Sequence, residues 1–166
     1  MKTSKIILII LISLFILLFL IRLTTPREID DIHPLRECEK KYIKKADILW
    51  VMPKYLNTPI SENKTWCQEI LSLNKTLGMH GITHSYHEFK NYVNETELIE
   101  AKQIFKDCFG YEPTLFKPPY LKLSKENKEL LEKNNLEIKW IWNQNLHKVY
   151  HCQDSGLFPN KFHDVF

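Results

Sequence analysis

A continuous apolar segment near the amino terminus constrains this chain more than any other feature. Residues 6–21 are apolar except for Ser13. The run lies between the roughly 7 to 15 residues of a signal-peptide core and the about 17 to 25 residues of a transmembrane helix. No Ala-x-Ala pattern follows it, which favours an uncleaved anchor over a cleaved signal peptide. The predicted organisation is a tail at 1–5, a transmembrane signal anchor at 6–23 and one domain at 27–166.

The charges around this segment bear on its orientation. Lys2 and Lys5 precede it and favour a cytoplasmic amino terminus, while Arg22 and Arg27 behind it weaken the asymmetry. We expect a single-pass membrane protein whose domain lies on the extracytoplasmic side.

The net charge is +3, and the basic residues are scattered among acids. Because no basic cluster is present in the sequence, nucleic acid is not an expected partner.

Cysteines and glycosylation sequons fit an exported domain. Cys38, Cys67, Cys108 and Cys152 could form two disulfides in any of three connectivities, and none lies in a Cys-x-x-Cys pair. Sequons begin at Asn63, Asn74 and Asn94. Buried thiols and unused sequons are the alternative interpretation.

The domain alternates predicted strands and helices. Strands are predicted at 27–33, 46–52, 79–83, 114–116 and 136–142, and helices at 35–45, from 61 to an end at Gly78, at 95–109 and at 124–134. Such alternation predicts an α/β fold with parallel strands. In these folds the chemistry gathers at the carboxyl ends of the strands.

Two histidines stand where such a site would form. His80 and His84 are four positions apart, and Gly81 lets the backbone turn so that both imidazoles can reach one ion. Zinc, cobalt, nickel and manganese accept imidazole nitrogen, and a carboxylate can complete the ligand set. Gly78 also marks a bend or a close approach, because the chain has only four glycines. For an isolated pair with this spacing, two solvated histidines are the alternative.

Three motifs in order carry a resemblance to a known family. Ile29-Asp30-Asp31, then His80-Gly81-Ile82-Thr83-His84, then Phe116-Lys117-Pro118-Pro119-Tyr120 resemble the motif set of the polysaccharide deacetylase (NodB-homology) superfamily. Within it the chain looks closest to the uncharacterised deacetylase-like family DUF2334, through residues 29–32, 59–63 and 116–124. The resemblance implies a short, distorted (β/α) barrel of the glycoside hydrolase/deacetylase type, preceded by one transmembrane helix.

Carried over position by position, the resemblance implies a metal site. Asp31, His80 and His84 would bind a divalent metal, zinc foremost, with cobalt, nickel or manganese as alternatives. Asp30 would be the general base for water activated by the metal. Adjacent strand residues point to opposite faces, so both acids reach one site only if Asp31 lies in the turn before Pro34.

The remaining catalytic positions match the family less closely. Lys117 stands where the family has an arginine that orients the catalytic acid, and a lysine cannot make the same two-pronged contact. A surface lysine is the alternative. Tyr120 would donate its backbone N–H to the oxyanion. His163 would protonate the leaving amine, with His147 and His151 as alternatives.

The predicted function is a metal-dependent hydrolase that removes N-acyl groups, acetyl above all, from a carbohydrate. The short tether between the anchor and the acids favours an acetylated surface glycan or glycolipid as substrate. A non-catalytic carbohydrate-binding or structural descendant of the fold is the alternative, favoured by the short chain and by Lys117. A small secreted zinc-binding interaction module is a third hypothesis.

Overall fold

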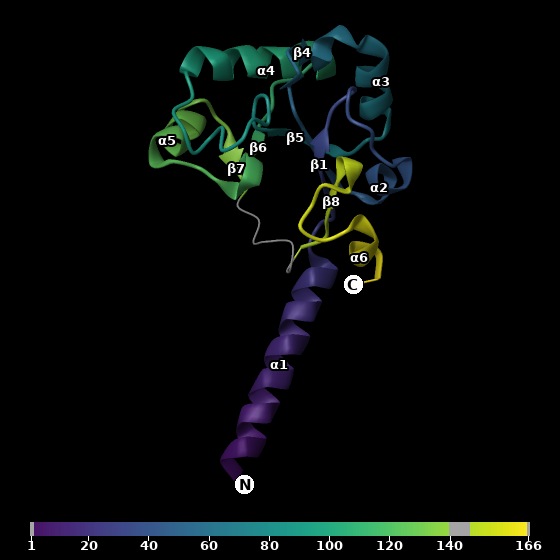
Figure 1. Ribbon diagram of the computed structural model, residues 1–166, viewed down its shortest axis with the longest axis vertical. Helices are drawn as coiled ribbons and strands as arrows, with labels where there is room; N and C mark the ends of the chain where they lie inside the picture. The colour runs from purple at the N-terminus through teal and green to yellow at the C-terminus, as the bar shows by residue number, and fades with distance from the viewer. Residues whose placement is uncertain (1, 140–146, 166) are drawn as a thin grey trace.

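Helix α1, Lys2–Thr24, projects as a stalk in the computed structural model, which describes residues 2–139 and 147–165 (Figure 1). Within its segment Lys5–Thr24, an 18-residue window has a mean hydropathy of 3.2, and 6% of that window is buried. This helix is therefore long and apolar enough to cross a membrane. A signal sequence has the same character, so the uncleaved anchor stays a prediction.

Parallel strands form the main sheet, in the order β7-β6-β5-β2-β1-β8. They are β1 Glu28–Ile32, β2 Ile48–Val51, β5 Thr76–His80, β6 Leu115–Lys117, β7 Glu137–Ile138 and β8 Val149–His151. Successive strands are neighbours and the last pairs with the first, as in a barrel. Within residues 2–139 and 147–165, no pairing joins β7 to β8. The parallel α/β class is confirmed, and the closed barrel stays a prediction.

The helices follow the sequence signals at their ends. They are α2 Lys40–Lys45, α3 Lys64–Ser72, α4 Glu95–Phe109, α5 Lys125–Lys133 and α6 Asn160–Val165, with 3-10 turns η1 Ile60–Glu62, η2 Pro119–Leu121 and η3 Cys152–Asp154. Asn94 caps α4 by accepting a hydrogen bond from Thr96 N, and Gly110, with a φ of 81°, ends it. Ser124 caps α5 in the same way. The predicted helix at 95–109 is therefore confirmed.

A separate antiparallel pair joins β3 Lys54–Tyr55 to β4 Thr58–Pro59.

Gly78 lies inside β5, so the prediction that it ends a helix is wrong. Helix α3 ends at Ser72, and Asn74, with a φ of 51°, reverses the chain before the strand begins. A Cβ on Gly78 would lie 2.3 Å from Cζ3 of Trp50, so the indole occupies the space of a side chain. The predicted close approach is thus present in a strand. The predicted strand at 79–83 is correspondingly shifted, to Thr76–His80.

Two disulfides use all four cysteines. Cys67–Cys108 joins α3 to α4, and Cys38–Cys152 joins the segment before α2 to η3. Of the connectivities that the sequence leaves open, this is the one present.

The predicted strand at 136–142 is represented by Glu137–Ile138, and its residues 140–142 lie outside the described residues.

Candidate active site

Asp30 and Asp31 both face one cavity because strand β1 bulges at Asp31. Its φ is 66°, and the register of β1 against β2 shifts between Ile29 and Ile32. In a regular strand, Asp30 and Asp31 would point to opposite faces of the sheet. The condition that the sequence sets for a shared site is met by this bulge inside β1, rather than by the expected turn before Pro34.

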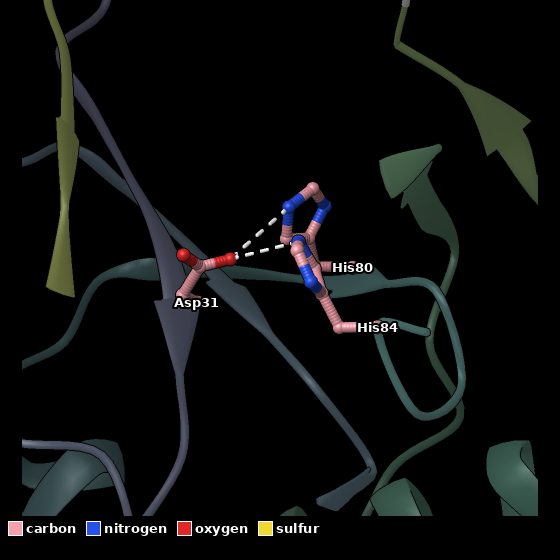
Figure 2. A group of neighbouring side chains, drawn as sticks. All are labelled: Asp31, His80 and His84. Carbon is pink, nitrogen blue, oxygen red and sulfur yellow. Dashed lines mark ion pairs between the residues drawn. The ribbon is translucent and has the colours of Figure 1, made fainter. Parts of the chain in front are cut away.

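Asp31, His80 and His84 come together as the sequence predicts for metal ligands (Figure 2). Asp31 Oδ1 lies 3.0 Å from His84 Nε2 and 3.5 Å from His80 Nε2. One donor atom from each residue lies within 4.8 Å of the other two. Asp31 Oδ1 is buried and has no directed hydrogen bond in the described part of the chain. Two imidazoles and a buried carboxylate oxygen without a directed hydrogen bond fit a divalent ion.

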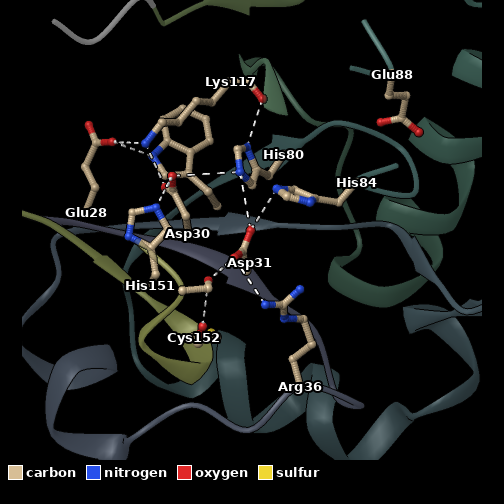
Figure 3. Close-up of polar contacts among 12 residues, drawn as sticks. Glu28, Asp30, Asp31, Arg36, His80, His84, Glu88, Lys117, His151 and Cys152 are labelled. Atoms are coloured by element: carbon tan, nitrogen blue, oxygen red, sulfur yellow. Dashed lines mark hydrogen bonds and ion pairs between the residues drawn. The ribbon is translucent and has the colours of Figure 1, made fainter. Parts of the chain in front are cut away.

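Surrounding groups orient two of these residues, His80 and Asp31. His80 Nδ1 lies 3.0 Å from the carbonyl oxygen of Lys117, which turns Nε2 toward the cavity. Ser155 Oγ donates to Asp31 Oδ2 at 3.0 Å, and Arg36 lies 3.4 Å from the same oxygen. Asp31 Oδ1 is therefore the oxygen that faces the imidazoles (Figure 3).

The protonation states of His80 and Asp31 suit metal binding. At His84, burial is outweighed by the neighbouring carboxylates of Asp31 and Asp30, which raise the pKa of this imidazole. Burial lowers the pKa of His80 to about 4, so this imidazole is neutral at neutral pH. Burial opposes the charge on Asp31, but the neighbouring imidazoles and Arg36 outweigh it and hold the pKa of Asp31 well below its usual range. A neutral imidazole and an ionised carboxylate are the forms that bind metal.

The loop between the two histidines is held by Glu88. This carboxylate accepts hydrogen bonds from Ile82 N at 2.9 Å, Thr83 N at 2.8 Å and Thr83 Oγ1 at 2.6 Å. Gly81 has a φ of 68°, and a Cβ there would lie 2.5 Å from both Glu88 Oε2 and Pro119 Cγ. Glycine is therefore required for this turn. No sequence motif marks Glu88 for this role.

Asp30 is held by a buried cation. Lys117 Nζ donates to Asp30 Oδ1 at 2.7 Å and to Glu28 Oε2 at 3.0 Å, and Trp50 Nε1 donates to the same Glu28 oxygen at 2.7 Å (Figure 3). Lys117 is 3% exposed, so it is not the surface lysine that the sequence leaves open. Glu28 belongs to this network, and sequence reasoning missed it.

The network keeps Asp30 charged despite its burial. Burial by itself raises the pKa of Asp30, but Lys117, His80 and His151 outweigh it and hold this pKa below its usual range. Burial works against the charge on Lys117 too, yet the two carboxylates raise its pKa. Burial raises the pKa of Glu28 in spite of Lys117. Asp30 is thus an ionised carboxylate at neutral pH.

A third histidine, His151, also lies beside the acids. Strand β8 pairs with β1 so that His151 lies opposite Asp30, and its Nε2 lies 3.5 Å from Asp30 Oδ2. His163 lies on α6, outside the cavity lining, and is fully buried. There Arg22 donates to its Nδ1 at 2.9 Å, and burial lowers its pKa to about 4. His151, one of the two alternatives that the sequence offers, therefore lies beside Asp30, and His163 does not.

The acids and histidines line a cavity of about 550 Å³. Its walls include Asp30, Asp31, Arg36, Tyr55, His80, His84, Lys117, Pro118, Tyr120, Leu121, His151, Ser155 and Leu157. Tyr120 has a φ of 55° and is half exposed, with its ring centroid 5.1 Å from that of His84. All the predicted site residues except His163 thus line this cavity.

No protein-family model and no curated protein matches the chain. Solved structures do match. A deacetylase solved with its substrate has a TM-score of 0.53 at 12% identity, over 77% of this chain and 76% of that chain. A polysaccharide deacetylase from Bacillus cereus has a TM-score of 0.48 at 16% identity, over 63% of this chain and 64% of that chain.

A mutant of a pseudoenzyme of carbohydrate esterase family 4 has a TM-score of 0.45 at 16% identity, over 56% of this chain. The match spans 33% of that pseudoenzyme, so this chain corresponds to about a third of its length. The likeness to the substrate-bound deacetylase is one of fold, and the chain therefore has a deacetylase-like α/β fold.

Proposed function

We propose that this protein is a metal-dependent hydrolase that removes N-acyl groups, acetyl above all, from a carbohydrate. The observation that carries the proposal is that Asp31, His80 and His84 converge while the ionised Asp30 lies 3.8 Å from His80 Nε2 in the same cavity. This arrangement supports membership of the polysaccharide deacetylase superfamily and its short barrel. The closeness to DUF2334 rests on the sequence strings alone.

A divalent ion held by Asp31, His80 and His84 would supply Lewis-acid chemistry, polarising the acyl carbonyl and making water more acidic. The chain's own residues move the protons. Lys117 holds Asp30 Oδ1, so Oδ2 is the oxygen that faces His80 and His151. Asp30 Oδ2 accepts a proton from the attacking water as the new C–O bond forms.

His151 supplies the second proton. Its Nε2 lies 3.5 Å from Asp30 Oδ2, on the cavity side of β8. In the proposed reaction it protonates the leaving nitrogen while the C–N bond breaks, which releases the free amine of the sugar and a carboxylate. Tyr120 has the role that the resemblance implies, and its backbone N–H donates a hydrogen bond to the oxyanion.

The same reaction gives the test. Metal content and acetate release from acetylated glycans are measured for the full chain in detergent, for wild type, Asp30→Asn, His151→Asn and His163→Asn. We expect Asp30→Asn and His151→Asn to retain metal and lose activity by roughly 10²-fold or more. His163→Asn should retain activity if it folds, which a spectroscopic check of folding establishes. Metal binding without acetate release from wild type would instead make the protein a carbohydrate-binding descendant of the fold.

Helix α1 and the disulfides support the place of action that we propose. Thr24 ends α1 and Glu28 begins β1, so a short link joins the apolar helix to the strand that carries both acids. Two disulfides support an oxidising compartment outside the cytoplasm. We therefore propose a single-pass anchored domain that acts on an acetylated surface glycan or glycolipid. Equal activity of wild type and an anchorless variant on membrane-bound glycan would contradict the role of the anchor.

A further inference from the structure

Three sequons lie on the surface around α3 and α4, outside the proposed active site. Asn63 precedes α3, Asn74 follows it, and Asn94 precedes α4. All three asparagines are exposed. The threonines that complete the sequons two positions later are exposed as well: Thr65, Thr76 and Thr96. Both parts of each sequon are therefore at the surface of the folded domain, where a bulky, water-soluble group is tolerated.

The side-chain atom that a glycan is attached to differs from the atom that caps each helix. Asn63 Oδ1 accepts a hydrogen bond from Trp66 N at 3.1 Å, and Asn94 Oδ1 accepts one from Thr96 N at 2.9 Å. These oxygens cap α3 and α4. An N-linked glycan replaces one hydrogen on Nδ2 and leaves Oδ1 as an acceptor. Both caps are therefore compatible with a glycan.

Asn74 lies in the turn between α3 and β5. Its φ is 51°, and its backbone N–H donates to Leu71 O at 3.1 Å. Helix α3 ends at Ser72 and β5 begins at Thr76, so Asn74 belongs to a short surface connection. Such connections tolerate added groups better than the elements that they join. A glycan on Asn74 therefore leaves the pairing of β5 undisturbed.

The sequons belong to the end of the domain away from the stalk. Figure 1 shows α3 and α4 at that end, whereas α1 leaves from the opposite one. The disulfide Cys67–Cys108 ties α3 to α4. The described lining of the 550 Å³ cavity includes none of the three asparagines. The points of attachment are therefore remote from the stalk and outside the cavity.

We propose that Asn63, Asn74 and Asn94 carry N-linked glycans. The donor is a glycan joined through phosphate to a membrane lipid, and a membrane-bound transferase brings it to the exported chain. A bond forms between Asn Nδ2 and the anomeric carbon of the first sugar, while the bond from that carbon to the lipid phosphate breaks. Nδ2 loses one proton, and the lipid phosphate leaves.

The two disulfides support the compartment that this modification requires, since disulfides are typical of exported domains. The inference shares the extracytoplasmic location with the proposed function and is independent of the hydrolase activity. Acetate release therefore tests the hydrolase, and the mass of the sequon peptides tests the glycans.

The test locates the glycans by mass spectrometry. The full chain is isolated with its anchor from membranes of the cells that naturally make it, and its proteolytic peptides are measured. We expect glycan mass on the peptides of all three sequons. Asn57 is the matched control, because it is exposed and has a φ of 60°, close to that of Asn74, but no hydroxyl residue two positions later. Unmodified asparagine at all three sequons, or the same added mass on Asn57, would overturn the proposal.

Substitution of the threonines separates glycosylation from helix capping. Thr65→Ala, Thr76→Ala and Thr96→Ala remove a hydroxyl and leave each asparagine in place. Each variant should lose the glycan of its own sequon and keep the other two. Serine at the same position should retain the glycan, because it also completes a sequon. The caps of α3 and α4 use backbone N–H groups, so these variants keep them. Added mass that persists in the alanine variants would contradict the proposal.

Discussion

Lys117 Nζ donates a hydrogen bond to Asp30 Oδ1 at 2.7 Å, and both groups are buried. Glu28 lies 3.0 Å from the same ammonium, so one cation contacts two buried carboxyl groups. The resemblance assigns the orienting role to an arginine. Here the lysine contacts the acid, and Glu28 takes a second bond of the ammonium.

Lys117→Met should destabilise the protein, because it leaves two carboxylates buried without a cation. Removing one partner of such a pair costs about 3–5 kcal/mol. The free energy of unfolding is measured with urea on the full chain in detergent. Lys122→Met is the control, since Lys122 is exposed. The double variant Glu28→Gln/Lys117→Met should regain part of the loss, and equal stability of the Lys117 and Lys122 variants would contradict the network.

Zinc should stabilise the wild-type protein against heat, because it binds the folded triad and not the dispersed ligands. At a free concentration 1,000 times the Kd, the gain is about 4 kcal/mol. Melting curves with zinc and with a chelator measure it. His84→Ala should lose the gain, whereas His87→Ala, three positions along, should keep it because His87 is outside the triad. A gain that survives in His84→Ala would point to zinc bound elsewhere.

His163 should make the stability depend on pH below neutrality. Burial, with Arg22 beside the ring, lowers the pKa of His163 from 6.5 to about 4. The unfolded chain therefore binds the proton more tightly, and stability falls as the pH drops from 6.5 toward 4, by at most about 1.4 kcal/mol per pH unit. Urea unfolding with a chelator across this window should show a shallower slope for His163→Gln. An unchanged slope would show that His163 does not contribute.

The two disulfides should differ in what they support. The chain-entropy relation gives about 5 kcal/mol of stability for Cys38–Cys152 and about 4 kcal/mol for Cys67–Cys108, from separations of 114 and 41 residues. Only Cys38–Cys152 adjoins Arg36 and Ser155, the partners of Asp31. Replacing that pair by alanine should also weaken zinc binding, whereas replacing Cys67 and Cys108 should not. Calorimetric titration with zinc checks this, and equal affinities would contradict it.

Features with local causes could be predicted from the sequence. His80 and His84 belong to one loop, so their spacing and the glycine between them already indicate convergence. Asn94 and Gly110 mark the ends of α4 through caps that involve only nearby residues. That Asp30 lies beside Asp31 could also be predicted, because the two residues are consecutive in the sequence.

Features that depend on the pairing of distant segments could not be predicted. The placement of His151 beside Asp30 depends on the parallel pairing of β8 with β1, across more than a hundred residues. The same fold decides which cysteines meet and brings Arg36 and Ser155 to Asp31. The left-handed backbone of Asp31 was hidden too, because aspartate tolerates that conformation without requiring it.

The left-handed backbone conformation of Asp31 also limits how β1 can change during evolution. Glu28 and Asp30 share one face of the strand, and the bulge turns Asp31 toward the same cavity. Inserting or deleting a single residue between Glu28 and Ile32 would move at least one of these acids to the opposite face. The five-residue strand β1 must therefore keep its length among descendants of this chain.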